Sequence, residues 1–247
     1  MSLKDRVVLV TGAGRGIGAT TAKMFAEAGA QVVCADINVD FVDEVVEELK
    51  TSDLKASAAQ VDVAHKDQVA TLVGQILKKY DRLDILINNA GITRDALAMK
   101  MSEEHWDSVV QVNLKGTWIP CQAVIRPMRK NRWGRIINTA SIAARGNPGQ
   151  ANYSATKGAV ISLTRTLALE LATSGITVNC VAPGAIMTPM LEKVPEKTRE
   201  VFINRIPVKR FGTPEDIAST HLFLCSEGAA YITGQVIPVD GGMSIGM

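Results

Sequence analysis

The chain has 247 residues, of which 47% are hydrophobic and 21% charged, an ordinary composition for a globular protein. The net charge is +2, no basic block stands out and no apolar run approaches the roughly 18 residues that cross a bilayer, so we expect neither a nucleic-acid partner nor a membrane partner. The first strand-like run begins at residue 7, which leaves no room for a signal peptide and indicates a cytoplasmic protein.

Apolar, strand-like runs alternate with amphipathic helical stretches from one end of the chain to the other. We predict strands at 7–10, 31–35, 56–61, 85–87, 135–138, 177–181 and 235–238. Helices are predicted near 19–28, 39–50, 65–80, 102–113, 117–131, 151–173 and 214–225. This alternation is typical of an α/β fold with a doubly wound, Rossmann-like parallel sheet. Since no repeat, low-complexity stretch or linker divides the chain, we expect a single domain over residues 1–247.

A glycine-rich turn, TGAGRGIG at residues 11–18, connects the first predicted strand to the first helix. Absent side chains let a ligand approach the backbone, and the N–H groups of a helix N-terminus favour an anion. The spacing fits T-G-x-x-x-G-x-G and not the G-x-G-x-x-G fingerprint. We predict that the turn holds the diphosphate of a dinucleotide; the alternative is a glycine-rich turn without a ligand. The binding residues predicted here are Gly12, Arg15, Gly16, Ile17 and Gly18.

Asp36 ends the second predicted strand, at about the distance along the chain expected of an acid that binds the adenosine ribose. Its carboxylate would accept hydrogen bonds from the ribose diol and repel a 2′-phosphate, whereas Arg15 can reach such a phosphate. We predict a preference for NAD(H), with NADP(H) as the second candidate; a helix cap is the alternative role of Asp36. Asp62 and Val63 end the third strand and are predicted to border the adenine, and for Asp62 too the alternative is a helix cap.

The segment at 183–212 interrupts the alternation of strands and helices. It carries four prolines and mixes Met187, Met190, Leu191 and Phe202 with charged residues. An insertion of this length after a late strand predicts a lid near 185–212, over the crevice at the carboxyl ends of the strands. A surface loop with short helices is the alternative.

Tyr153 and Lys157 are four residues apart, which places both side chains on one face of the predicted helix. An ammonium beside a phenol favours the phenolate, so the pair predicts a Tyr153 pKa below its ordinary value of about 10. Such a phenol can donate and accept a proton near neutral pH. Ser141 follows the fifth predicted strand, upstream of the pair.

The cysteines and histidines indicate no further site. Far apart in the sequence, the cysteines form no C-x-x-C motif, which predicts buried free thiols. The three histidines share no ligand spacing, so no metal site is assigned.

These motifs together make the chain resemble the short-chain dehydrogenase/reductase family over essentially its full length. The likeness rests on the glycine turn, NNAG at 88–91, Asn113, Ser141, the Tyr153–Lys157 pair and Pro183-Gly184. Within the family, the chain is most similar to the 3-oxoacyl-[acyl-carrier-protein] reductases of fatty acid synthesis, through NNAGITRD at 88–95, GQANY at 149–153 and YITG at 231–234.

The resemblance implies a catalytic group made of Asn113, Ser141, Tyr153 and Lys157. Tyr153 would donate a proton to a substrate carbonyl that Ser141 orients, Lys157 would hold the nicotinamide ribose, and Asn113 would bind a water that links Lys157 to solvent. Further cofactor contacts are expected from Asn89, Ala90, Gly91, Pro183, Gly184, Ile186 and Thr188. Beside Ser141 and Tyr153, the substrate is expected to touch Ala143, Gln150, Met187 and Met190. Related enzymes also imply a homotetramer.

We therefore predict an NAD(H)-preferring oxidoreductase that interconverts a 3-oxoacyl thioester, of acyl carrier protein or coenzyme A, and its 3-hydroxyacyl form. The similar reductases usually use NADPH, which Asp36 does not favour. Relatives that dock the carrier protein tend to present basic residues on two neighbouring helices. The first helix here offers basic residues at 126, 129, 130 and 132, but the end of the second, at 172–175, has none. A coenzyme A thioester or a free ketone therefore becomes more plausible as the substrate. The alternatives are a catabolic secondary-alcohol dehydrogenase or ketone reductase and, more remotely, a non-catalytic dinucleotide-binding regulatory protein.

Overall fold

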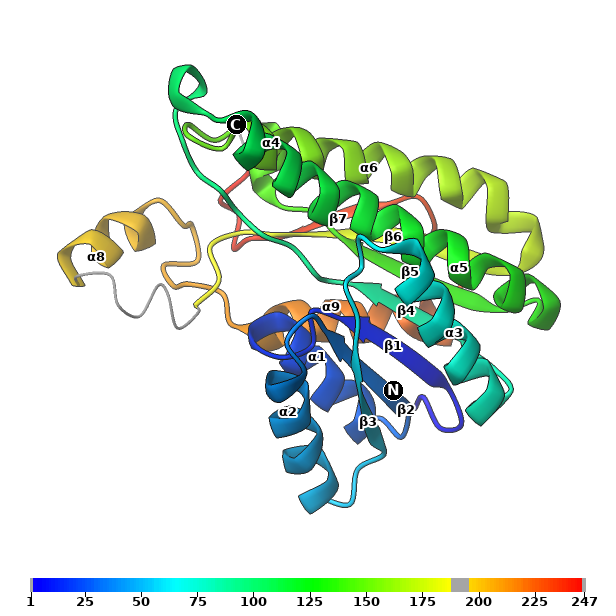
Figure 1. The fold of residues 1–247 in the computed structure, drawn as a ribbon. Helices are drawn as coiled ribbons and strands as arrows, with labels where there is room; N and C mark the ends of the chain where they lie inside the picture. The colour runs from blue at the N-terminus through cyan, green and yellow to red at the C-terminus, as the bar shows by residue number, and fades with distance from the viewer. Residues whose placement is uncertain (1, 188–195, 246–247) are drawn as a thin grey trace.

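A computed structural model, shown in Figure 1, describes residues 2–187 and 196–245. Its centre is one parallel sheet with the strand order β3-β2-β1-β4-β5-β6-β7, which confirms the predicted doubly wound sheet. The chain winds outward from β1 to β3 and then returns to β4 on the other side of β1, so the order reverses between β1 and β4. Ligands of open α/β sheets bind at such a reversal, outside the carboxyl ends of the strands. The strands are β1 Val7–Thr11, β2 Gln31–Asp36, β3 Ala56–Gln60, β4 Ile85–Asn88, β5 Gly134–Thr139, β6 Ile176–Pro183 and β7 Val236–Val239.

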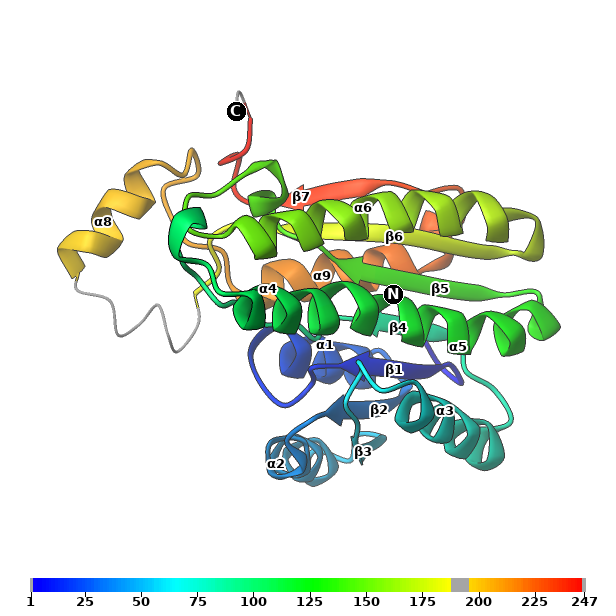
Figure 2. The same cartoon turned by 45° about the horizontal axis from the view of Figure 1, so that its top comes forward.

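Helices cover both faces of the sheet, which is why its central strands are apolar almost without alternation. In β1, Val7 and Leu9 pack into a core shared with α3, α5 and α6. Val8 and Val10 point the other way, into a core shared with α1, α2 and α9. Figure 2 shows α6 and the α4–α5 run lying across the same face. The bounds are α1 Gly16–Glu27, α2 Val39–Thr51, α3 Lys66–Tyr80, α4 Glu103–Val109, α5 Gly116–Asn131, α6 Ala151–Leu171 and α9 Pro214–Cys225.

The helices predicted near 102–113 and 117–131 are not separate. A π-helical segment, η2 Val110–Lys115, joins α4 to α5, so the chain is helical from residue 103 to residue 131. Such segments widen a helix locally and are frequent at functional sites. Asn113 is fully buried in this one. Hydrophobic periodicity extends through a π segment, so the sequence alone gave no sign of it.

The insertion predicted as a lid contains a helix, α8 Glu196–Asn204. Its two ends meet where Ile186 bridges to Gly212, with Met187 N donating to Gly212 O at 2.8 Å. Figures 1 and 2 both show α8 apart from the sheet, beyond the carboxyl ends of the strands. Residues 188–195 lie outside the described part of the chain, and the role of the insertion as a lid stays a prediction.

All four cysteines are buried and free, as predicted: Cys34, Cys121, Cys180 and Cys225. Among the described helices, none is both long and apolar enough to cross a membrane.

Candidate active site

The glycine turn between β1 and α1 is shaped by close backbone contacts. Gly12 and Gly16 have φ values of +65° and +54°, in the left-handed region that favours glycine. A Cβ built on Gly18 would lie 2.0 Å from Gly12 O, so the turn closes only without that side chain. At Gly16, by contrast, no described atom lies within 4 Å of a built Cβ, and the position faces open space. The turn is therefore a backbone cradle that is closely packed at Gly12 and Gly18 and open at Gly16.

The N-terminus of α1 opens into this cradle. Arg15 occupies the N-cap position, and within the described chain its side chain makes no capping hydrogen bond. The first N–H groups of a helix lack partners in their own helix, so those of α1 remain available to an anion. The residues present fit the diphosphate of a dinucleotide.

Two adjoining pockets form a crevice between this turn and the predicted catalytic residues. One part, of about 420 Å³, is bordered by Gly12, Asp36, Asp62, Val63 and Ala90. The other, of about 520 Å³, is bordered by Ser141, Tyr153, Lys157, Pro183, Gly184 and Ile186. Both parts share Arg15, Ile17, Asn89, Gly91 and Ile92. The crevice thus lies over the carboxyl ends of the central strands, and it brings together predicted residues that are up to 174 positions apart, from Gly12 to Ile186.

Asn89 holds the turn in place. Its amide nitrogen donates to Thr11 O at 3.3 Å and to Gly12 O at 3.1 Å. The Thr11 hydroxyl in turn accepts from the backbone N–H groups of Asn89 and Ala90. The glycine turn and the NNAG segment are therefore one hydrogen-bonded unit, and the Asn89 side chain supports the backbone beside the crevice.

Asp36 lies at the other end of the crevice and is not a helix cap. Asn38 caps α2 instead, by accepting from the backbone N–H of Asp40. Asp36 Oδ2 accepts from Gly14 N at 3.2 Å and Oδ1 accepts from Asn38 N at 3.1 Å. The carboxylate thus ties the glycine turn to the end of β2 while it borders the crevice.

Asp62 does not cap α3 either, since His65 occupies that position. Its carboxylate accepts from Ala64 N and lies 2.9 Å from His65 Nδ1. Val63 packs against Gly116, where a built Cβ would lie 2.7 Å from Val63 Cγ2.

The four predicted catalytic residues converge from three elements. Lys157, only 3% exposed, donates from Nζ to Thr139 O at 2.6 Å, and Nζ lies 5.5 Å from the centre of the Tyr153 ring. A Cβ built on Gly91 would lie 3.6 Å from Lys157 Nζ and 3.3 Å from Asn113 Oδ1. Gly91 therefore allows Lys157 and Asn113 to approach the same point.

Asn113 and Ser141 have defined local roles. The Asn113 amide accepts from Ile92 N at 2.8 Å and donates to Ile92 O at 2.9 Å, so it clamps the residue after NNAG. The Asn113 backbone carbonyl accepts from the Thr117 hydroxyl at 2.7 Å, and the water that Asn113 is expected to bind stays a prediction. Ser141 begins a short 3₁₀ helix, its hydroxyl accepting from Ala143 N at 3.1 Å.

The pKa of the Tyr153 phenol is raised in this structure. Burial is the main cause, the Ser141 hydroxyl opposes it, and the Asp95 carboxylate adds to it. Burial also lowers the pKa of the Lys157 ammonium to about 8. The predicted lowering of the Tyr153 pKa is thus wrong for the protein alone, because a four-residue spacing shows a shared helix face but not how deeply the groups are buried.

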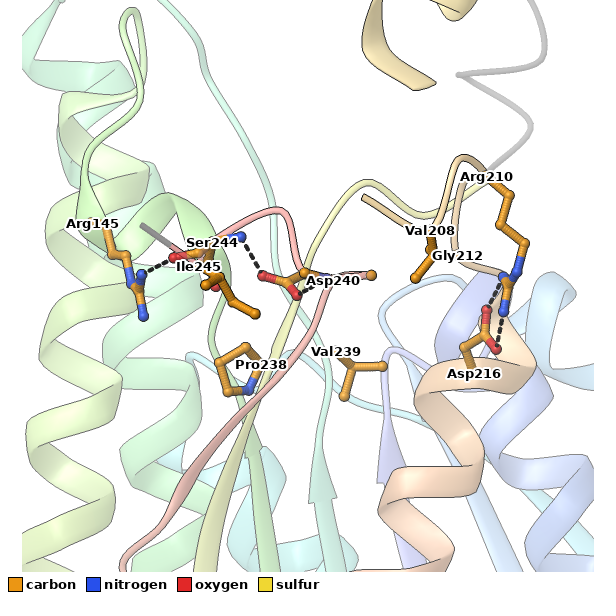
Figure 3. Close-up of a pocket in the computed structure, with 12 residues that line it drawn as sticks. Arg145, Val208, Arg210, Gly212, Asp216, Pro238, Val239, Asp240, Ser244 and Ile245 are labelled. Carbon is orange, nitrogen blue, oxygen red and sulfur yellow. Dashed lines mark hydrogen bonds and ion pairs between the residues drawn. The ribbon is translucent and has the colours of Figure 1, made fainter. Parts of the chain in front are cut away.

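A third cavity, of about 750 Å³, lies at the carboxyl end of β7. Figure 3 shows Arg145 reaching the backbone carbonyl of Ser244 on one side and Arg210 paired with Asp216 on the other. Asp240, between them, accepts from Gly242 N and Ser244 N. Since these charged groups already have partners and the predicted catalytic residues line the crevice instead, the crevice is the candidate site for the cofactor.

Comparison with known proteins identifies the family. Residues 12–244 match the family described as enoyl-(acyl carrier protein) reductase. The 3-oxoacyl-[acyl-carrier-protein] reductase FabG of Thermotoga maritima is 48% identical, over 99% of this chain and 100% of that protein. Subunit BbsD of the (2S)-[(R)-hydroxy(phenyl)methyl]succinyl-CoA dehydrogenase of Thauera aromatica is 44% identical over 99% of each chain. The crystal structure of levodione reductase superposes with a TM-score of 0.94 at 36% identity, over 99% of each chain.

The chain belongs to the short-chain dehydrogenase/reductase family. It is an NAD(P)-dependent oxidoreductase of that family, as the motifs predicted.

Several residues that border the crevice were not predicted from the sequence. Phe41, Thr93, Arg94 and Thr139 all border the crevice. Thr139 directly follows the strand predicted at 135–138 and is the last residue of β5, so the end of that strand could have indicated it. Phe41 lies under the Arg15 guanidinium, 5.5 Å from Cζ to the ring centre, and no local motif marks it.

The structure describes the predicted substrate contacts apart from Met190. Ala143 donates its N–H to Ser141, and Met187 is fixed by Gly212. Both ends of the Gln150 amide are already hydrogen-bonded, to Asp95 and Asn147. Met190 lies outside the described residues, as does Thr188, which was predicted as a cofactor contact.

Gly18→Ala is expected to raise the Kd for the dinucleotide by at least about tenfold, equivalent to roughly 1.4 kcal/mol. The new Cβ would collide with Gly12 O, so the cradle has to open. Binding is measured by titrating the quenching of protein fluorescence. Gly74→Ala in α3 is the matched control, since no described atom lies within 4 Å of its built Cβ. That change should stabilise the helix by about 1 kcal/mol and leave Kd unaltered; an unaltered Kd in Gly18→Ala would contradict the cradle.

Proposed function

We propose that this protein is an NAD(H)-preferring oxidoreductase that interconverts a 3-oxoacyl thioester and its 3-hydroxyacyl form. The observation that carries the proposal is the crevice formed by the two adjoining pockets. At one end it presents a carboxylate, Asp36, and at the other a phenol, a hydroxyl and a buried ammonium. Hydride transfer is the chemistry that the bound dinucleotide supplies.

The catalytic steps assigned to the protein are proton transfer and orientation. Ser141 would donate a hydrogen bond to the substrate carbonyl oxygen and stabilise its developing negative charge. Tyr153 would give its phenolic proton to that oxygen, and in the oxidation direction would take it back. Lys157, held by Thr139 O, would supply positive charge beside the phenol and hydrogen bonds to the nicotinamide ribose. Asn113 would hold the Ile92 backbone, and with it the NNAG segment, in place beside the crevice.

A coenzyme A thioester is favoured over an acyl carrier protein as the natural substrate. Two of the arginines considered for carrier docking are engaged within the chain. Arg129 Nε donates to Ser174 Oγ at 3.2 Å, and Arg132 Nη2 donates to Thr173 O at 3.4 Å. The turn at 172–175 itself carries no basic residue. The similar dehydrogenase of Thauera aromatica is named for a coenzyme A thioester.

The test is the initial rate of NADH and NADPH oxidation with acetoacetyl-CoA, with an acetoacetyl-carrier protein, and with simple ketones. We expect turnover of acetoacetyl-CoA that is faster with NADH than with NADPH. Little thioester turnover beside rapid ketone turnover would favour the second candidate, a ketone reductase, for which the likeness to levodione reductase is the specific support. Crotonyl-CoA, which offers a double bond but no ketone, tests the enoyl reduction named in the family description. No turnover of any substrate, with dinucleotide binding intact, would favour a regulatory protein.

We further propose a homotetramer. Apolar side chains lie exposed on α5 and α6, including Trp118 and Leu169, and β7 is an edge strand with partly exposed residues. Covering this surface with copies of the same chain would remove it from water.

A further inference from the structure

The segment at residues 92–96 connects the two halves of the catalytic group. At its start, Ile92 is clamped through both backbone groups by Asn113. In its middle, Arg94 O accepts from the fully buried amide of Asn152, at 3.0 Å. At its end, Ala96 pairs with Gln150 in a parallel bridge. The segment therefore joins the π-helical site of Asn113 to the beginning of the helix that carries Tyr153.

Asp95 makes a side-chain contact at this junction. Its Oδ2 accepts from Gln150 Nε2 at 2.9 Å, and Gln150 Oε1 accepts from Asn147 Nδ2 at 2.8 Å. Gln150 occupies the N-cap position of α6, and its carbonyl accepts from Ser154 N at 2.8 Å. Asp95 thus holds, through one amide, the first turn of the helix from which the Tyr153 phenol projects.

The Asp95 carboxylate also acts on the phenol by its charge. A negative charge nearby disfavours the phenolate, and Asp95 raises the Tyr153 pKa in addition to burial, while the Ser141 hydroxyl lowers it. Other charged or titratable side chains belong to elements around the phenol. They are Lys157 on α6, Arg15 at the glycine turn, Arg94 on the same segment, Arg145 on the 3₁₀ helix after Ser141, and His105 on α4.

We propose that Asp95 is a positioning residue: through the Gln150 amide it fixes the first turn of α6, the helix that carries Tyr153. This rests on the proposed role of Tyr153 as the acid and base. It also changes the role of Gln150, predicted as a substrate contact, to that of a link between Asp95 and the catalytic helix.

The charge is tested with Asp95→Asn in the protein without substrate. Asparagine keeps an oxygen that can accept from Gln150 but removes the negative charge. The chain has only three tyrosines, so tyrosinate absorbance against pH, with Tyr153→Phe as the reference to subtract, isolates the Tyr153 titration. We expect that titration to move to lower pH in Asp95→Asn, and the movement to shrink in high salt. Asp107→Asn, which removes another exposed acid, from α4, is the matched control and should leave the titration in place. An unmoved titration in Asp95→Asn, or an equal movement in Asp107→Asn, would overturn the electrostatic role.

The tether is tested by comparing Asp95→Asn with Asp95→Ala, which removes the acceptor as well. Both variants should move the pH dependence of kcat/KM to lower pH. Only Asp95→Ala should also lose about threefold or more in kcat at its own optimum, with an unfolding temperature close to that of Asp95→Asn. Equal kcat in the two variants would refute the tether. Full activity of Tyr153→Phe would refute the proposed function instead, and the absorbance titration would still report on Asp95.

Discussion

Replacing Tyr153 by phenylalanine is expected to lower kcat for acetoacetyl-CoA reduction by about 10²–10⁴-fold, the usual contribution of a positioned acid or base. The phenylalanine ring would fill the same space as the tyrosine ring, so only the phenolic hydroxyl, with its exchangeable proton, is lost. The affinity for NADH should stay within about threefold, because the cradle at the glycine turn is untouched. Steady-state rates and a fluorescence titration of NADH, made on the same preparation, measure both quantities.

Tyr231→Phe is the matched control for this experiment. Tyr231 is fully exposed and undergoes the same chemical change, so its kcat should equal that of the unaltered protein. Two results would contradict the assignment of Tyr153. Unchanged turnover in Tyr153→Phe would mean that another group delivers the proton. A loss of NADH affinity as large as the loss of kcat would mean that the hydroxyl mainly serves binding.

The fold was predictable from the sequence because each element carries a local signal. The strands β1, β4, β5 and β6 are buried throughout, and in β1 and β4 this burial on both faces gives a nearly continuous apolar run. Their order in the sheet has no such local signal and comes from the long-range packing seen in the structure. The same holds for the π segment, since its widened turn is fixed by the pairing of Asn113 with Ile92, 21 residues away in the chain.

The candidate site could be predicted as a set of residues that border one crevice, but not as a set of interactions. Motif spacing indicated Asp36, Ser141, Tyr153 and Lys157, and all four border the crevice. The bonds from Asp36 to Gly14 and Asn38 depend on a turn and a strand end that meet only in the folded chain. Similarly, the direction of the Tyr153 pKa shift depends on burial, and Asp95 acts on it from a different segment.

Asp36→Ala is expected to reduce the ratio of kcat/KM with NADH to kcat/KM with NADPH by about 10–100-fold. Hydrogen bonds to a charged group contribute about 1.5–3 kcal/mol, and each 1.4 kcal/mol is about a factor of ten. The loss of the carboxylate removes acceptors for the ribose diol and the repulsion of a 2′-phosphate. Arg15 and Asp36 border the same part of the crevice, so removing the acid also leaves the guanidinium free to attract that phosphate. Initial rates with both nucleotides, at fixed acetoacetyl-CoA, give the ratio.

The alanine change also removes the hydrogen bonds from Gly14 N and Asn38 N, so the turn loosens as the charge disappears. Asp36→Asn separates the two effects, because one amide oxygen can still accept from the backbone while the negative charge is gone. Most of the change in ratio should appear in Asp36→Asn, while the greater loss of unfolding free energy should appear in Asp36→Ala. Adding Arg15→Ala to Asp36→Asn should then remove the gained NADPH activity. If the NADH/NADPH ratio in all these variants equals that of the unaltered protein, neither side chain selects the nucleotide. The preference would then have to come from the backbone of the turn.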